Sequence, residues 1–297
     1  MRTDRTDATP GLSPQGATRA AWQPISPARA RALTDARLQL HHAAQLATAA
    51  GISFLPPRPD DSHTNLEWLA ASSALASRAV PAGGGTAFRV AVRVPDLTLL
   101  LLPAAPDGRE LESYALHGRT LRDAGAWLAA AAGELGADAR RFTLARHYEI
   151  PAHAVARGAP FDAGAADDFA ELARWFGNAD GMLRALAAAT PGASEVRCWP
   201  HHFDIATLID AGAGRSVGAG LEPGDESYAE PYWYVSPHPS PAAGAALPTL
   251  AGGGFWHTAG WTGAVLRGSG LTPDASRQRE QVEAFLASAV SACRALR

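Results

Sequence analysis

The chain has 297 residues, of which 47% are hydrophobic and 19% are charged, and its formal net charge is −3. This is enough chain for one large domain or two fused domains with a packed core, and the charge gives no general attraction to nucleic acid. Every basic residue is arginine, and the absence of lysine excludes Schiff-base catalysis, pyridoxal phosphate anchored on a lysine, and the lysine of a P-loop.

No targeting or membrane signal is present in the sequence. No apolar run approaches the roughly 20 residues that cross a bilayer, and the first residues lack the apolar centre of a secretory signal. Cys198 and Cys293 are too few for a disulfide framework, which agrees with a reducing compartment. We therefore expect a cytoplasmic protein without nucleic-acid or membrane partners, with residues 1–24 as a disordered tail. The sequence does not define the oligomeric state.

The first half begins with a helical pattern and continues with strands. Ser26 followed by a proline, with apolar residues at helical spacing, predicts a helix over about 27–50. A proline-rich connector then leads to a short helical stretch near 65–78. Two strands are expected within 86–103, turning at a proline and an aspartate, and a third strand over about 110–116.

A capping box starts the next helix, and the second half then follows the same order. Thr120 and Asp123 form the expected box, and Gly136 marks the end of that helix. A helix is predicted over about 166–189, and a last helix begins at Thr272. Between them, strands are expected around 195–221, 231–236 and 255–266.

Both halves have the order helix, several strands, helix. This predicts an α+β fold with mainly antiparallel sheets flanked by helices, since consecutive strands with short links pair antiparallel. It also suggests an internal duplication into pseudo-repeats 25–150 and 160–297, inside one integral unit spanning 25–297. Whether the halves share one sheet or form two stays open. A doubly wound nucleotide-binding fold is disfavoured, because no glycine-rich loop follows a strand.

The most chemically dense segment is 199–238, which contains WPHHFD, PGDESYAEPYWYVSP and a further histidine. On an extended chain His202 and Asp204 share one face, and Glu230, Tyr232 and Tyr234 share another. If these two strands are neighbours, their polar side chains converge.

This convergence suggests a metal-dependent hydrolase that acts on a small molecule. Histidine and carboxylate are ligands for zinc, iron or manganese, and an open position would activate a bound water. In this hypothesis His202, Asp204, Glu230 and His257 hold the divalent metal. Glu226 or His201 moves the proton, and the substrate contacts Tyr232, Tyr234 and Trp256. No HExxH motif is present, so the assignment depends on proximity in the fold.

Three alternatives use the same residues. The first is a non-haem iron oxidoreductase with the same ligands, and the second is a metal-free site in which His201 or His202 is the general base. The third is a noncatalytic small-ligand-binding or assembly protein, in which the acids stabilise turns; Asp225, for example, would cap the PGDESY turn through its side chain. From the first half, either the pair of histidines at 41–42 or the segment at 147–149 could complete a site, and the latter is preferred.

The motif pair WPHHFD and PGDESYAEPYWYVSP resembles bacterial families of unknown function, together with ARHYEIP and GGGFWHTAGWTGAVL. The resemblance covers about residues 25–297. It implies one integral unit and supplies no reaction or ligand.

Overall fold

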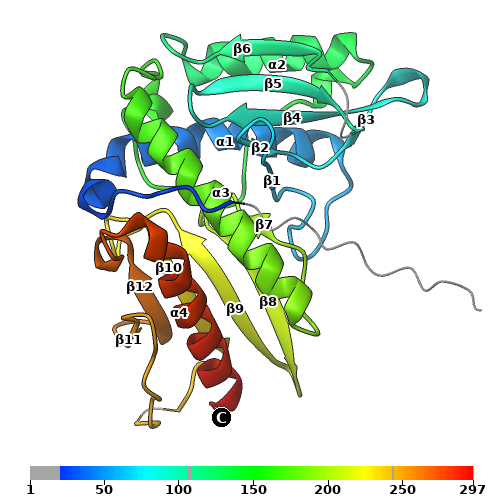
Figure 1. Cartoon of the computed structure of the whole chain (residues 1–297). Helices are drawn as coiled ribbons and strands as arrows, with labels where there is room; N and C mark the ends of the chain where they lie inside the picture. Colours follow the sequence, from blue (N-terminus) through cyan, green and yellow to red (C-terminus); the bar gives the residue numbers. More distant parts are fainter. Residues whose placement is uncertain (1–20, 106–108, 243, 297) are drawn as a thin grey trace, which may run out of the picture.

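The computed structural model describes residues 21–105, 109–242 and 244–296. In these residues four α-helices and two six-stranded antiparallel sheets form an α+β fold, with the first sheet above the second in Figure 1. The predicted fold class is confirmed, and the two halves form two sheets.

The first sheet packs against the helix that precedes it. A 3₁₀ helix, η1 (Pro27–Leu33), leads into α1 (Thr34–Phe54), which contacts β4, and α2 (Leu121–Glu134) follows the sheet and lies beside α1. The strand order is β1-β2-β4-β5-β6, and β3 also pairs with β4. The strands are β1 (Glu67–Leu69), β2 (Ala74–Ala76), β3 (Val80–Pro81), β4 (Ala87–Arg93), β5 (Thr98–Pro103) and β6 (Glu112–Ala115).

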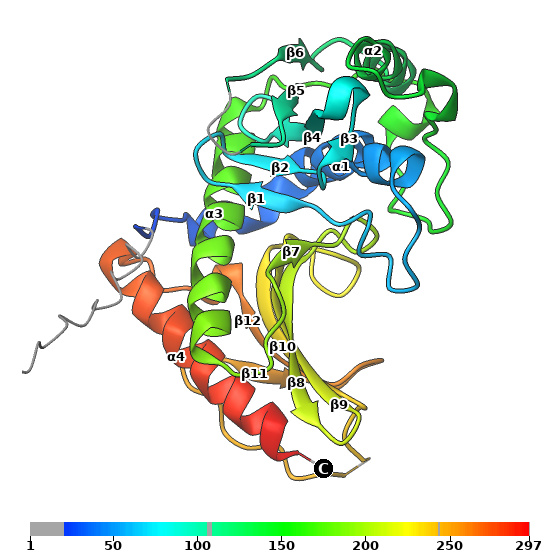
Figure 2. The ribbon, with the colours of Figure 1, turned by 90° about the vertical axis from the view of Figure 1, so that its right-hand side faces the viewer.

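The second sheet is covered on one face by α3 (Ala166–Ala189) and α4 (Ala275–Ala295), as Figure 2 shows. Its strand order is β11-β12-β10-β9-β8-β7. The strands are β7 (Arg197–Cys198), β8 (Ile205–Gly212), β9 (Arg215–Glu222), β10 (Tyr232–His238), β11 (Phe255–His257) and β12 (Gly263–Arg267). Both halves have the order helix, strands, helix along the chain. Their sheets differ at one edge: the last strand of the first half, β6, is an edge strand, whereas in the second sheet β11 is the edge strand and β12 lies between β11 and β10. The duplication itself stays a prediction.

One local prediction is wrong. The segment 65–78 contains β1 and β2 instead of a short helix. Its alanines and leucines favour a helix, but pairing of β2 with β4 buries Leu75 completely, and this tertiary contact overrides local propensity. Just before β1, Leu66 and Cys198 exchange two backbone hydrogen bonds of 2.9 and 2.8 Å, which join the edges of the two sheets.

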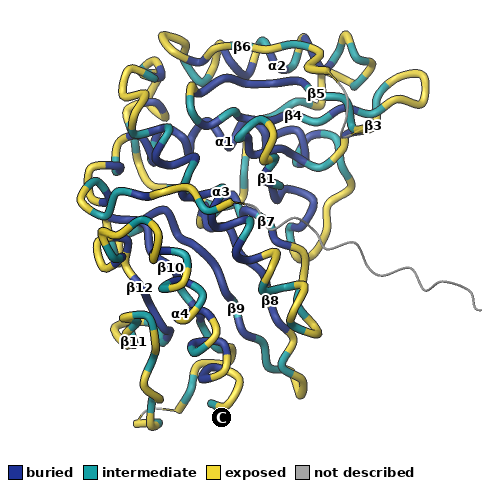
Figure 3. Tube along the Cα trace, viewed as in Figure 1, coloured by how far each residue is buried: buried dark blue, intermediate teal, exposed yellow. Residues whose placement is uncertain are grey.

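A single cluster of buried hydrophobic side chains extends through both halves. Helix α1 lies near its centre: most of its residues are buried, including polar ones, as the dark blue segments in Figure 3 show. A helix that is buried nearly all round must place its polar side chains against partners. Arg37, His41 and Gln45 have their partners in the second half of the chain, whereas Ser53 bonds with Thr143 and His42 with Pro151.

The predicted tail ends too late. Residues 1–20 lie outside the described residues, but Trp22 donates its indole N–H to Oε1 of Gln278 over 3.2 Å, and the Gln23 amide donates to Asn178 over 2.8 Å. Gln278, fully buried on α4, also accepts from the amide of Ile25 over 3.0 Å and donates to its carbonyl over 2.8 Å. Residues 22–25 are therefore tied to the C-terminal helix and, through Asn178, to α3.

The sequence predicts no membrane-spanning segment, and the helices of the structure bear on this prediction. Within the described ranges, none combines the length and the apolar character that a bilayer crossing needs.

Replacing Gln278 by leucine should release this N-terminal segment. Gln278→Leu keeps the side-chain volume but leaves the amide and carbonyl of Ile25 without partners, so we expect a loss of about 1–3 kcal/mol of unfolding free energy. Urea denaturation measures the loss, and hydrogen exchange at the Ile25 amide should accelerate. Glu280→Gln, exposed on the same helix, is the control. Unchanged exchange at Ile25 would contradict the clamp.

Candidate functional site

The WPHHFD segment forms a tight turn between β7 and β8, within the range around 195–221 where strands were expected. The amide of Trp199 donates to the carbonyl of Asp204 over 2.8 Å, and the amide of Phe203 donates to the carbonyl of Trp199 over 2.6 Å. Phe203 has a φ of 74°, in the left-handed region. Side chains in such a turn do not alternate as they do on an extended chain, so His201 and His202 line the same cavity.

Two side chains of α1 hold this turn. The carbonyl oxygen of Pro200 accepts hydrogen bonds from Nε2 of His41 over 2.8 Å and from Nε2 of Gln45 over 2.9 Å. The His41 ring also stacks on Phe203, with centroids 4.5 Å apart and planes 6° from parallel. Burial lowers the pKa of His41 to about 3, so its ring is neutral and uncharged in this apolar stack at physiological pH.

The floor of the cavity comes from β9 and β10. Tyr232 lies opposite Glu222 and Tyr234 lies opposite Gly220 in the antiparallel register, and directly opposed residues share a face of the sheet. The alternation predicted for β10 holds here, since Trp233 points to the other face and is fully buried on the side of the helices.

Gly220 lets Tyr234 reach across β9. A Cβ at position 220 would lie 2.7 Å from ring and hydroxyl atoms of Tyr234 and 2.8 Å from the carbonyl oxygen of Ile205. Without that Cβ, the Tyr234 ring lies over the strand, and its hydroxyl donates a short hydrogen bond to Oδ2 of Asp204. Asp204 is thereby oriented from two strands away.

The PGDESY loop closes another side of the cavity. Oδ1 of Asp225 accepts from the amides of Ser227 and Tyr228 over 2.8 and 2.9 Å, which is the side-chain cap that the sequence predicts for this turn. Its other oxygen, Oδ2, accepts from the hydroxyl of Tyr232 over 2.8 Å. The turn and the tyrosine therefore fix each other.

These elements enclose a cavity of about 500 Å³ between α1, the WPHHFD turn, the PGDESY loop and the open face of the second sheet. The volume suits a small molecule. Its lining contains four carboxyl side chains and one guanidinium, which belong to Asp204, Glu222, Asp225, Glu226 and Arg37.

Asp204 and Glu222 form a buried carboxyl pair. Burial raises the pKa of Glu222 well above its ordinary value, and the nearby carboxylates of Asp204 and Asp225 raise it further, against the opposing attraction of Arg37. Burial also raises the pKa of Asp204, but the hydrogen bond from Tyr234 partly offsets this by favouring the ionised form. Glu222 is therefore the member of the pair that keeps a proton more readily.

Two buried polar atoms in the lining lack partners. Among the described residues neither Oε1 of Glu222 nor Nε of Arg37 makes a hydrogen bond, although these residues are only 5% and 7% exposed. Nη1 of Arg37 donates to the carbonyl of Gly224 over 2.5 Å, which holds the guanidinium against the loop. Unsatisfied buried polar groups are rare in proteins and are typical of binding sites.

The histidines lie at the cavity with different exposure. His201 is half-buried, and burial lowers the pKa of its ring, while His202 is exposed. The two rings lie 4.4 Å apart between centroids. Glu226, the other residue predicted to move a proton, also lines the cavity and is exposed.

Glu230, predicted as a metal ligand, is directed elsewhere. Its carboxylate accepts from the amide of Ser269 over 2.6 Å and from the Ser269 hydroxyl over 2.9 Å, and it lies 3.5 Å from Nε of Arg31. Glu230 precedes β10 by two residues, so the strand alternation that places Tyr232 in the cavity does not extend to it. It connects the loop to the 3₁₀ turn after β12.

His257 and Trp256 also lie outside the cavity lining. His257 accepts a hydrogen bond at Nδ1 from the hydroxyl of Tyr228 over 2.7 Å and donates from Nε2 to the carbonyl of Ala259 over 2.7 Å. Its ring stacks on Trp261, which does line the cavity, with centroids 4.4 Å apart. The indole of Trp256 donates to the carbonyl of Pro248 over 2.7 Å. These side chains support the rim and do not form it.

The proposed metal ligands are therefore not brought together. In the part of the chain that the structure describes, no three His, Cys, Asp or Glu side chains are arranged to hold a metal ion. Of the predicted set, His202 and Asp204 share the cavity, whereas Glu230 and His257 are bonded elsewhere. No chemical step is assigned to a metal here.

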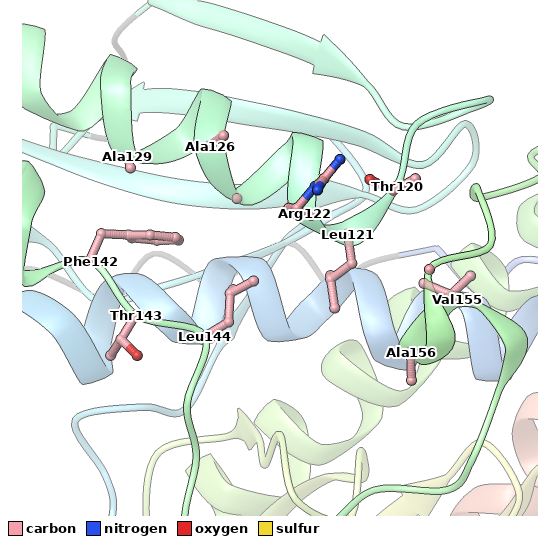
Figure 4. A pocket seen from close by; sticks show the side chains of 12 residues that line it. Thr120, Leu121, Arg122, Ala126, Ala129, Phe142, Thr143, Leu144, Val155 and Ala156 are labelled. Carbon is pink, nitrogen blue, oxygen red and sulfur yellow. The ribbon is translucent and has the colours of Figure 1, made fainter.

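Three other cavities are larger but lack this chemistry. One of about 590 Å³ lies between α3 and α4, and Arg294 is its single ionisable lining residue among those described. Two are larger still. One of about 820 Å³ lies between α2 and the segment 142–158, and Figure 4 shows its mainly apolar lining. Arg122 is its single ionisable lining residue among those described. The other, of about 860 Å³, lies against the first sheet and contains charges that are already paired, such as Arg89 with Glu67 at 2.8 Å.

Sequence reasoning missed Glu222 and Arg37, and it preferred the wrong first-half group. His41 lines the cavity, while His147 instead lies 2.9 Å from Asp61. Glu222 had one usable signal: it ends an apolar strand directly before a proline and glycine turn, a position where functional side chains gather. Arg37 had none, because a single arginine on a helix has no distinguishing spacing.

Filling the space at position 220 should disturb the tyrosine and aspartate contact. Gly220→Ala forces Tyr234 or β8 to move, and we expect a loss of about 1–3 kcal/mol of unfolding free energy. Gly218→Ala is the matched control on the same strand face, because its Cβ would lie 3.3 Å from the Ser236 hydroxyl and contact no backbone as closely. Equal losses in urea denaturation of the two variants would contradict this account.

Removing the Glu222 carboxyl should stabilise the protein at neutral and alkaline pH. The folded state raises the pKa of Glu222, so the unfolded chain loses this proton first as pH rises, and wild-type stability falls above the ordinary pKa of about 4.3. Glu222→Gln has no such proton to lose, and we expect it to gain about 1–3 kcal/mol at pH 8. Thermal unfolding from pH 4 to pH 8 measures the difference, which should shrink toward pH 4. If the stability of Glu222→Gln relative to wild type were lower at pH 8 than at pH 4, the raised pKa of Glu222 would be contradicted.

Comparisons of the chain with models of known protein families, with curated proteins and with solved structures found no match. The resemblance of its motif pair to families of unknown function stays a prediction.

Proposed function

We propose that this protein is an enzyme that hydrolyses a small polar molecule in the cavity by acid–base chemistry at the Asp204 and Glu222 pair. The observation that carries the proposal is two buried carboxyl groups in one cavity, one directly before β8 and one at the end of the neighbouring β9, with environments that separate their proton affinities. Pairs of titratable groups separated in this way are typical of acid–base assignments in enzymes.

The environments give each carboxyl a role. Glu222, which keeps its proton, donates it to the leaving group of the substrate. Asp204, held by the Tyr234 hydroxyl, stays ionised more readily and accepts a proton from the attacking water. One proton leaves Glu222 and one arrives at Asp204, so the pair returns to its starting state by exchanging a proton.

The histidines support that exchange. His202 is exposed at the cavity and interacts with the Asp204 carboxylate, and the ring of His201 lies 4.4 Å from it between centroids, so the two rings connect that carboxyl group with solvent. Histidine titrates near neutral pH and moves protons at low cost. This role resembles the one expected for His201 from the sequence, without a metal.

Metal-dependent hydrolysis and iron-dependent oxidation stay predictions, because their ligand set has no assembled counterpart among the described residues. The noncatalytic alternative uses the same cavity as a binding site. Activity measurements with and without a chelator separate metal-free hydrolysis, metal-dependent catalysis and noncatalytic binding.

The test is a panel of chromogenic esters, amides, phosphate esters and glycosides, with pH–rate profiles for any substrate that is turned over. We expect Glu222→Gln and Asp204→Asn to lower kcat by about 10²- to 10⁴-fold, the range for removing a general acid or base. Glu134→Gln, an exposed carboxyl on α2 outside the cavity, is the matched control and should keep full activity.

Two outcomes would contradict the proposal. An unchanged pH–rate profile in Glu222→Gln would exclude this residue as the acid. Activity that is lost on chelation and restored by zinc or manganese would favour the metal-dependent hydrolase instead.

A further inference from the structure

The charge of the cavity is unbalanced. Four carboxyl groups line it against one guanidinium, and that guanidinium, of Arg37, is already bonded to the carbonyl of Gly224. The neighbouring His41 is neutral, because burial lowers its pKa to about 3. Even with Glu222 protonated, the three other carboxyl groups outnumber the single guanidinium, so the cavity has a surplus of negative charge, which is unfavourable where it is buried.

One of these carboxyl groups has a buried oxygen without a partner. Glu222 lines the cavity and is only 5% exposed. Its Oε1 makes no hydrogen bond with any described residue. Asp225, in contrast, has both oxygens occupied by its own turn and by Tyr232. A hydrogen-bond donor with positive charge would satisfy Glu222 and offset the surplus together.

The size and the walls of the cavity favour an organic cation over a metal ion. A volume of about 500 Å³ is far larger than a bare ion needs, and no three metal-binding side chains converge among the described residues. Tyr232, Tyr234 and Trp261 line the same space. Aromatic faces attract ammonium and guanidinium groups through their negative charge density.

We propose that the cavity binds a small organic cation, an ammonium or guanidinium compound, whose charged N–H groups donate to Glu222 and approach the carboxylate of Asp204. This inference rests on the proposed function in that it names the substrate class for the same cavity. In that class, the cationic group orients the substrate and the bond to be hydrolysed lies beside the carboxyl pair.

Binding of simple probes to the full chain tests the charge requirement. Isothermal titration with benzylamine and methylguanidine is compared with benzyl alcohol and benzoate, which have a similar shape but are neutral or negative. We expect benzylamine to bind at least about tenfold more tightly than benzyl alcohol, a difference of about 1.4 kcal/mol, and benzoate to bind more weakly than either. Equal binding of the amine and the alcohol would overturn the inference, as would no binding of either cation at millimolar concentration.

Variants assign the binding to this cavity. Asp204→Asn removes the ionised member of the pair and should weaken benzylamine binding about tenfold or more, Glu222→Gln keeps a neutral accepting oxygen and should weaken it less, and Glu134→Gln should leave it unchanged. Thermal unfolding of each variant confirms that it is folded. Unchanged benzylamine binding in both Glu222→Gln and Asp204→Asn would overturn the inference, and so would displacement of benzylamine by stoichiometric magnesium or zinc.

The outcomes separate this inference from the proposed function. Cation-selective binding without turnover of any cationic ester or amide would support the ligand class and contradict the enzyme. Turnover of neutral substrates that needs Glu222, with no preference for cations, would support the enzyme and overturn the ligand class.

Discussion

Two side chains of α1 donate to one carbonyl oxygen, that of Pro200, and the site depends on this contact. His41 and Gln45 come from the first half of the chain, and the turn that they hold belongs to the second. A turn with a left-handed residue is not stable on its own, and here buried hydrogen bonds and the stack of His41 on Phe203 fix it. The WPHHFD turn also sets where β8 starts, and therefore where the Asp204 carboxyl lies in the cavity.

The same contact explains why the two sheets form one site. Helix α1 is buried between them, and its polar side chains find partners in the WPHHFD turn and, through Arg37, in the PGDESY loop. A single hydrophobic cluster then extends across both halves. If the halves arose by duplication, they now contribute different parts of the site: the first half supplies helix α1, and the second half supplies the carboxyl groups.

Regular elements could be predicted from the sequence, whereas the convergence at the site could not. The capping box at Thr120 and the alternation of Tyr232 and Tyr234 are local patterns, and the structure has both. The WPHHFD turn depends on α1, which lies some 150 residues earlier, and Glu230 is drawn away by a serine after β12. Such contacts depend on tertiary packing, so strand alternation alone assigned the wrong partners to His202 and Glu230.

The stability cost of the carboxyl pair is itself an argument for function. A core selected only for folding would place apolar or neutral residues at positions 204 and 222, since an unpaired buried acid lowers stability as soon as it ionises. Here Gly220 makes room for a tyrosine that orients one acid, and the other, in the wall of the same cavity, has a buried oxygen without a partner. Proteins retain such unfavourable arrangements where a ligand or a transition state supplies the missing partner. The missing partner of this cavity is a positively charged hydrogen-bond donor.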